Sequence, residues 1–152
     1  MKLRTGDEII GCDIVPQNYD ADLLVVTSDG FGKRTKLSEF RGQNRGGIGL
    51  IATKFKTNES RLVALTIVSE SDDIMLVTAS GIVSRIKAGD ISQQGRPATG
   101  VRAQNLVDND TVVSVNKIIS PDEEDAILEK ALPQDAKNEA ETTPDVEQTK
   151  LI

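Results

Sequence analysis

Short aliphatic runs that end in turn sequences recur along the chain. Residues 23–27 form such a run and lead into Ser28-Asp29-Gly30, and residues 74–78 lead in the same way into Ala79-Ser80-Gly81. The glycine that closes each turn supplies the positive φ that a tight hairpin requires. Further strand patterns fall near residues 48–56, 61–69, 100–106 and 111–119. The pattern predicts an all-β chain of antiparallel strands.

Polar and apolar side chains alternate after each of these turns. Successive side chains of a strand point to opposite faces, so each segment has one apolar face and one face with two cations. The cations are Arg34 and Lys36 in the first segment and Arg85 and Lys87 in the second. We expect the apolar faces to point inward and the cations outward. Lys33 departs from the alternation, which favours a position near a sheet edge.

The chain contains an internal sequence repeat, whose two copies are offset by a constant 51 residues. Arg34-x-Lys36 returns as Arg85-x-Lys87, and Gln43-x-Arg45-x-x-x-Gly49 returns as Gln94-x-Arg96-x-x-x-Gly100. Self-similarity at this period, with four strand patterns in each unit, is typical of a propeller-type or solenoid array. In such an array each repeat packs only on its neighbours.

A partial copy of the unit lies at the front of the chain, because residues 8–15 match the last strand pattern of both later copies. We assign residues 1–21 to the end of a preceding truncated blade, 22–72 and 73–120 to two blades, and 121–152 to a disordered acidic tail. The chain would then begin inside a unit, as the end of a longer protein or as a reading frame that starts at an internal Met. Cys12 lies on the first strand pattern, where buried packing is expected.

The net charge of −6 conceals a division between body and tail. Residues 121–152 hold ten acids and three bases, whereas residues 31–61 hold eight bases and two acids. A cationic cluster that partly recurs at residues 84–102 favours a polyanion site over ordinary solvated surface. An acidic tail tethered beside such a site is expected either to compete with the polyanion or to act as a solubilising extension.

Other classes of function receive little support. The chain has no His and one Cys, and the carboxylates at 72–73 and 108–110 fit turns better than metal ligands. We therefore expect no catalysis, no metal and no cofactor. No apolar run is long enough to span a membrane, and the first residues lack the hydrophobic stretch of a secretory signal. A cytoplasmic protein with no membrane partner is the expectation.

The most specific string is Gln43-Asn44-Arg45-Gly46-Gly47-Ile48-Gly49. Glycines place no Cβ in the path of a phosphate, so backbone amides and a neighbouring Arg can approach it closely. The same glycines could instead serve only to shape a loop between blades. The neighbouring arginines favour phosphate contact.

These strings resemble the C-terminal domain of DNA gyrase A, the DNA-wrapping part of a bacterial type II topoisomerase. The similar stretches run from about Leu3 to Leu128, and residues 22–27, 30–35 and 73–78 look like blade openings of that family. The family's hallmark heptapeptide is Gln-Arg-Arg-Gly-Gly-Lys-Gly, which residues 43–49 match except at Asn44 and Ile48. The string is a degenerate copy of that motif.

The resemblance implies a β-pinwheel of four-stranded blades linked by strand exchange, whose rim cations bend double-stranded DNA without reading its sequence. It implies as partners the core of gyrase A and the ATP-binding gyrase B, whose ATP-dependent strand passage at the nucleoid yields negative supercoils, while this part alone is not catalytic. The expected DNA-binding residues are Lys33, Arg34, Lys36, Arg41, Gln43, Arg45, Gly46, Gly47, Arg85, Lys87, Arg96 and Arg102. The alternatives are a protein–protein interaction repeat and a nonfunctional fragment of gyrase A, and the strings do not separate gyrase from topoisomerase IV.

Overall fold

The computed structural model describes residues 3–15 and 20–118, so the predicted acidic tail lies outside the described residues. The chain divides into two units, 1–118 and 119–152, and all described residues belong to the first. Their secondary structure consists of β-strands and two short 3-10 helices. Neither of these helices has the length and apolarity that crossing a membrane would require.

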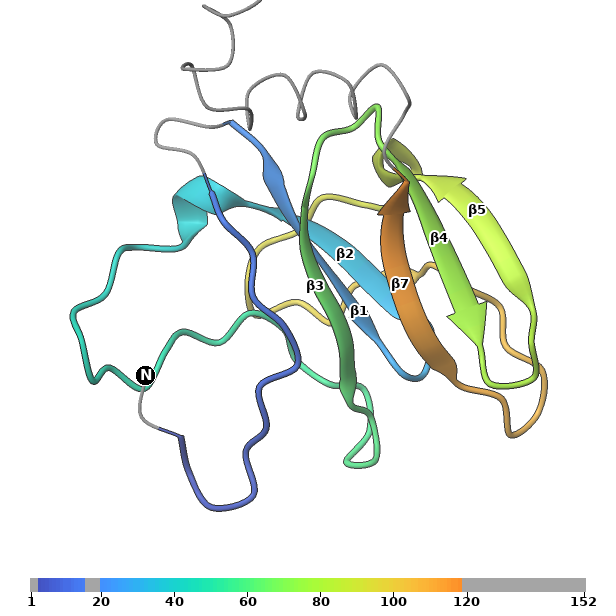
Figure 1. Ribbon diagram of the computed structural model, residues 1–152, viewed down its shortest axis with the longest axis horizontal. Coiled ribbons are helices and arrows are strands. Elements are labelled where there is room, and N and C mark those ends of the chain that lie inside the picture. Colours follow the sequence, from blue (N-terminus) through green and yellow to red (C-terminus); the bar gives the residue numbers. More distant parts are fainter. Residues whose placement is uncertain (1–2, 16–19, 119–152) are drawn as a thin grey trace, which may run out of the picture. The chain divides into compact units, whose positions relative to one another are not determined.

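The strands form two antiparallel sheets (Figure 1). In the first sheet the order is β3-β1-β2-β6, and in the second it is β5-β4-β7. This arrangement confirms the prediction of an all-β chain built as a partial array of blades. The strand bounds are β1 Asp22–Thr27, β2 Phe31–Lys36, β3 Leu62–Val68, β4 Asp73–Thr78, β5 Val83–Lys87, β6 Val101–Arg102 and β7 Val112–Ile118.

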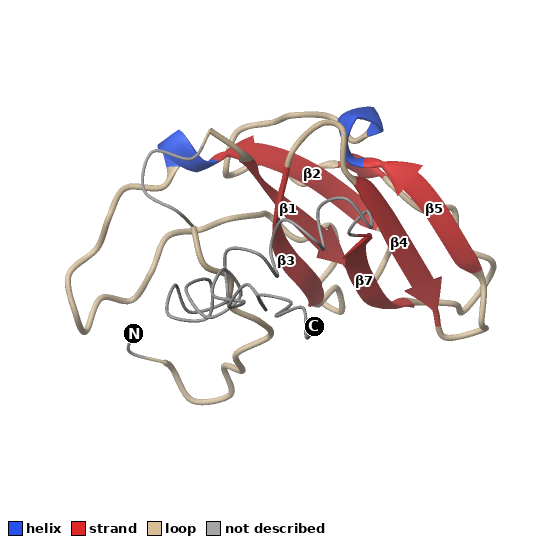
Figure 2. Ribbon diagram, turned by 45° about the horizontal axis from the view of Figure 1, so that its top comes forward, coloured by secondary structure: helices blue, strands red, loops and turns tan. Residues whose placement is uncertain are grey.

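The two hairpins have the same register, as the repeat requires. Asp22 faces Lys36 across β1 and β2, and Asp73 faces Lys87 across β4 and β5. The turn glycines adopt positive φ, 78° at Gly30 and 88° at Gly81. A 3-10 helix follows each hairpin, η1 at Leu37–Glu39 and η2 at Ala88–Asp90 (Figure 2). The predicted turns and the repeat are therefore confirmed at the level of the backbone.

The sheet of the first repeat is completed by residues of the second repeat. Phe31 pairs with Arg102 and Gly32 with Val101, and the N–H of Ala103 donates to the carbonyl of Gly30 at 2.9 Å. This is the strand exchange that the resemblance implied. The strand expected over 100–106 shrinks to two residues, and residues 48–56 form no strand. Residues 101–102 pair with β2, whereas a backbone hydrogen bond of residues 48–56 runs from the N–H of Lys54 to the carbonyl of Ala98, and one such bond does not make a strand ladder.

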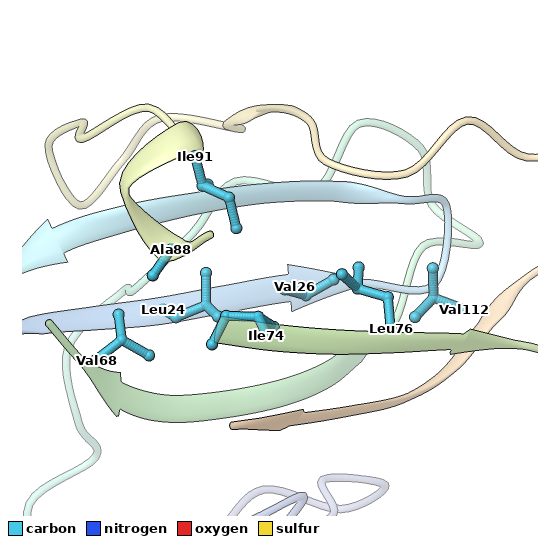
Figure 3. Close-up of a cluster of buried hydrophobic side chains, with 8 residues drawn as sticks. All are labelled: Leu24, Val26, Val68, Ile74, Leu76, Ala88, Ile91 and Val112. Atoms are coloured by element: carbon cyan, nitrogen blue, oxygen red, sulfur yellow. The ribbon is translucent and has the colours of Figure 1, made fainter. Parts of the chain in front are cut away.

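The main apolar core lies between the two sheets (Figure 3). Leu24 and Val26 of β1 meet Ile74 and Leu76 of β4, and all four are fully buried. Val68, Ala88, Ile91 and Val112 complete the cluster. Every residue of β1 is buried, whereas buried and half-buried residues alternate along β4. The first hairpin is thus covered on both faces and the second on one.

Residues 8–15 do not form the strand that the repeat pattern predicted. Asp13 Oδ2 instead accepts a hydrogen bond of 2.9 Å from the N–H of Ile67 on β3. This segment therefore contacts β3 through a side chain and not through backbone pairing. Cys12 is exposed, and its expected burial is wrong. Ile9 and Ile14 are exposed as well, because this segment presents no packed apolar face.

Candidate nucleic-acid interface

Arg34 is buried, so the expectation that it faces outward is wrong. Its guanidinium donates to Asp22 Oδ2 at 2.6 Å and to the carbonyl of Ile91 at 2.8 Å. The covering comes from the second repeat, because the N–H of Gln94 donates to the carbonyl of Arg34. Lys36, two residues further along β2, remains exposed.

Lys33 is also buried, and β2 is an inner strand, so its expected place near a sheet edge is wrong. Its Nζ donates to the carbonyls of Gly95, at 2.7 Å, and Arg96. Burial lowers the pKa of the Lys33 ammonium, and the charge of Glu39 opposes this shift. Lys33 therefore fixes the loop that carries Arg96 and has no surface to offer a ligand.

Arg85 and Lys87 are exposed, as expected of the cations in the second repeat. Both contact one carboxylate, Asp73, at 2.6 Å from Arg85 Nη2 and 3.4 Å from Lys87 Nζ. The hydrogen bond from Arg85 holds the pKa of Asp73 below its usual value. These two cations lie at the surface, but part of their charge is neutralised locally.

The glycine-rich string forms an exposed loop after η1. Arg41, Gln43, Asn44, Arg45 and Gly46 are all exposed. An open hollow of about 300 Å³ is lined by Arg41, Gln43, Asn44, Gly47 and Gly49. Gly46 and Gly49 have φ of 79° and 90°, a conformation that side chains rarely adopt, so the glycines shape this loop.

Arg96 reaches the other side of the same loop. It lines a second open hollow of about 570 Å³ together with Arg4, Asp7 and residues 48–51. Its guanidinium lies over the ring of Phe40, 5.9 Å from the centroid. The structure therefore brings Arg96 to the glycine-rich loop. Arg4 was missed, because it belongs to no repeated motif.

Two cations meet over one aromatic ring at the start of β2. Lys56 Nζ lies 4.4 Å and Arg102 Cζ 5.4 Å from the centroid of Phe31. Cation–π contacts of this kind hold a cation in place without neutralising it. Lys56 was not among the expected DNA-binding residues, although the charge count over residues 31–61 already included it.

Eleven of the twelve expected residues, together with Lys56, fall into three exposed groups and one buried pair, and the twelfth, Lys36, lies exposed at the end of β2 outside these groups. The loop group is Arg41, Gln43, Arg45, Gly46, Gly47 and Arg96, of which Gly47 and Arg96 are half-buried. The ring group is Lys56 and Arg102 around Phe31, and the β5 group is Arg85 and Lys87 on Asp73. The buried pair is Lys33 and Arg34. Among the described residues no cluster of ligands suited to a metal ion occurs.

Comparison with known proteins gives one consistent result. The family model described as DNA gyrase C-terminal domain, beta-propeller, matches residues 21–69 and again residues 72–118. The DNA gyrase A protein of Staphylococcus epidermidis is 39% identical over 123 residues, which are 81% of this chain and 14% of that protein. The chain therefore spans a small part of the length of the curated relatives that it matches.

Two solved structures share the fold. The C-terminal domain of DNA topoisomerase IV superposes with a TM-score of 0.63 at 28% identity, covering 72% of this chain and 33% of that one. The C-terminal domain of a DNA gyrase A superposes with a TM-score of 0.60 at 36% identity, covering 66% of this chain and 34% of that one. With the two family matches and the exchanged strand, these likenesses show that the chain belongs to the DNA gyrase C-terminal domain family of beta-propellers.

Proposed function

We propose that this chain binds and bends duplex DNA as part of the C-terminal region of a gyrase A protein. The observation that carries the proposal is the set of exposed cations in the loop group and the ring group, on a fold whose family is a DNA gyrase domain. Lys36 and the β5 group would add further contacts. Lys33 and Arg34 act inside the protein, where they bind backbone carbonyls at residues 91–96 of the second repeat.

The contacts are to the sugar–phosphate backbone. Lysine and arginine side chains and a glycine-rich loop suit phosphate oxygens, which carry no direct sequence information. Bending tens of base pairs costs several kcal/mol, and contacts along a curved protein surface offset that cost. DNA binding by this chain is therefore expected to be independent of sequence and steeply dependent on salt.

The activity of a complete topoisomerase lies beyond this chain. Because the chain matches 14% of a DNA gyrase A protein, we place the reacting groups in the remainder of gyrase A and the ATP-binding site in gyrase B. In that assembly the present residues position DNA so that strand passage introduces negative supercoils. The place of action is then the bacterial nucleoid, in the cytoplasm.

A salt titration tests the proposal directly. Binding of the chain to a short duplex of random sequence, followed by fluorescence anisotropy, should show log affinity falling linearly with log salt concentration. Arg45→Gln in the loop group should reduce the slope by about 0.9, which corresponds to one lost phosphate contact. A binding constant that does not change with salt would contradict the proposal and would favour a protein–protein interaction module.

Arg61→Gln is the matched control for this titration. Arg61 is also exposed and also cationic, but its guanidinium is occupied by the carbonyls of Asn58 and Ser60 in its own turn. It belongs to none of the three exposed groups. The slope of this variant should stay close to that of the original chain. An equal reduction in both variants would show that net charge, and not the loop group, determines binding.

A further inference from the structure

One edge of the second sheet has no neighbour among the described residues. The order β5-β4-β7 leaves β5 at an edge, whereas its counterpart in the first sheet, β2, is paired with β6. The edge is apolar where the exchanged segment would begin, because Ile82 is 40% and Val83 59% exposed. An open, apolar strand edge is a template for pairing with another backbone.

The chain also contains the segment that such an edge accepts. Residues 48–53 correspond, at the offset of 51, to residues 99–104, which include the exchanged strand. Gly49 has a φ of 90° and its counterpart Gly100 a φ of 97°, so both segments begin with the same backbone turn. Ile48 and Ile51 are 69% and 73% exposed, and residues 48–53 form no strand.

We propose that residues 49–52 of one copy of this chain pair with the free edge of β5 in a second copy, as residues 100–103 pair with β2 within one chain. The pairing would join copies head to tail. It goes beyond DNA binding, because it requires no nucleic acid.

The backbone contacts transfer one by one from the contact within the chain. Gly32 with Val101 becomes Val83 with Leu50, and Phe31 with Arg102 becomes Ile82 with Ile51. The N–H of Ala103, which donates to the carbonyl of Gly30, is replaced by the N–H of Ala52 donating to Gly81. Likewise the N–H of Gln94, which donates to the carbonyl of Arg34, is replaced by that of Gln43 donating to Arg85. These donors and acceptors belong to the backbone, so they are kept whatever the side chains are.

Some side chains would strengthen the contact between copies relative to the contact within one chain, and others would weaken it. The contact between copies would bury four aliphatic side chains, Leu50, Ile51, Ile82 and Val83. The contact within one chain contains Phe31 and Val101 but also Gly32 and the charged Arg102, so it buries less aliphatic surface. Ser84 stands where Lys33 fixes the loop, and Gly42 stands where Gln93 bonds to Asp22, so these anchors are lost. A Cβ on Gly32 would lie 3.0 Å from Cβ of Ala103, so Val83 requires the strands to part slightly. The contact between copies should therefore be weaker than the one within a chain and should depend on concentration.

The two surfaces lie on different parts of the chain, so the contact is not symmetric. Each copy that joins leaves one free β5 edge and one free donor segment, which allows growth into a ring or a filament. This distinguishes the proposal from a two-fold dimer, in which the same patch meets itself.

Complementary variants test the proposal. Ala52→Pro removes the backbone N–H that would donate to Gly81, and residues 48–53 form no strand within one copy, so this variant should fold. Val83→Lys places a charge on the β5 edge at a position that is 59% exposed, so this variant should fold as well. Sedimentation velocity should show the original chain growing in mass with concentration and each variant alone staying monomeric. An equimolar mixture of the two should form a species of twice the chain mass and none larger, because each copy keeps one working surface.

Val113→Lys on β7 is the control, because Val113 is 53% exposed on the opposite edge of the same sheet. Its self-association should equal that of the original chain. Circular dichroism of each variant verifies that it is folded. An original chain that stays monomeric at all concentrations would overturn the proposal. So would single variants that still associate, or a mixture that stays monomeric.

Discussion

The same ion pair occurs once in each repeat, and only its surroundings differ. Asp22 pairs with Arg34 and Asp73 with Arg85, in both cases at 2.6 Å. The exposed fractions of the arginine and aspartate side chains are 5% and 10% in the first repeat but 65% and 23% in the second. Residues 91–94 cover the first pair, and among the described residues no segment covers the second. The neighbouring repeat, and not the repeat's own sequence, decides whether this cation is structural or available to a ligand.

The buried ion pair of Asp22 and Arg34 also makes additional hydrogen bonds within the protein. Gln93 Nε2 donates to both oxygens of Asp22 at 3.0 Å, and Arg34 reaches the carbonyl of Ile91. A buried ion pair loses its hydration, so it needs such additional hydrogen bonds to remain favourable. In the second repeat the side chain of Asp73 is 23% exposed and pairs with both Arg85 and Lys87.

Removing the two arginines should have very different consequences. Arg34→Met leaves Asp22 buried without its cation, which should lower the free energy of unfolding by about 3–5 kcal/mol. Arg85→Met removes the equivalent group at the surface, where water replaces it, and should have little effect. Urea unfolding of both variants measures the difference. Equal losses in the two variants would mean that the segment at 91–94 does not protect the first pair.

The two turn glycines isolate the contribution of the exchanged strand. Gly30 and Gly81 both have positive φ, so alanine at either position should cost about 1–2 kcal/mol of backbone strain. A Cβ at Gly30 would also lie 2.6 Å from the carbonyl oxygen of Gln104, whereas a Cβ at Gly81 meets nothing within 4 Å. Gly30→Ala should therefore be the more destabilising variant in thermal melting. Equal melting temperatures of the two variants would show that residues 101–104 do not pack against Gly30.

Asp73→Asn should strengthen DNA binding by a modest factor, on the order of several-fold at low salt. The substitution releases Arg85 and Lys87 from their shared carboxylate, and the salt slope should steepen by up to about 0.9 for each phosphate newly engaged. Fluorescence anisotropy on a short duplex measures this change. Unchanged affinity would show that the β5 group takes no part in binding.

Local features of the sequence predicted the hairpins well, because an aliphatic run and a turn glycine act within a few residues. The partner of a strand is not local. Residues 48–56 and 100–106 carry the same pattern, yet only the second segment forms a strand that pairs with a described strand, so strand length could not be predicted from either. The burial of Lys33 and Arg34 was missed for the same reason. The recurring spacing of Asp22 to Arg34 and of Asp73 to Arg85 did hold a usable signal for the ion pair.

Other expectations from the sequence stay predictions. The blade boundaries stay predictions, the DNA contacts of the exposed groups are tested by the binding experiments above, and the acidic tail at 121–152 lies outside the described residues. The expected burial of Cys12 failed because residues 8–15 follow β3 through the side chain of Asp13, which a strand pattern does not reveal.

Lysine labelling with and without DNA tests most directly which cations serve the fold and which serve the ligand. Acetylation read by mass spectrometry should leave Lys33 unmodified in both states, because its side chain is fully buried. Lys36, Lys56 and Lys87 should react in the free chain, since all three are exposed, and Lys56 in particular should lose reactivity when duplex DNA is bound. A Lys33 that reacts in the free chain and is protected by DNA, beside a Lys56 that reacts equally in both states, would contradict the account.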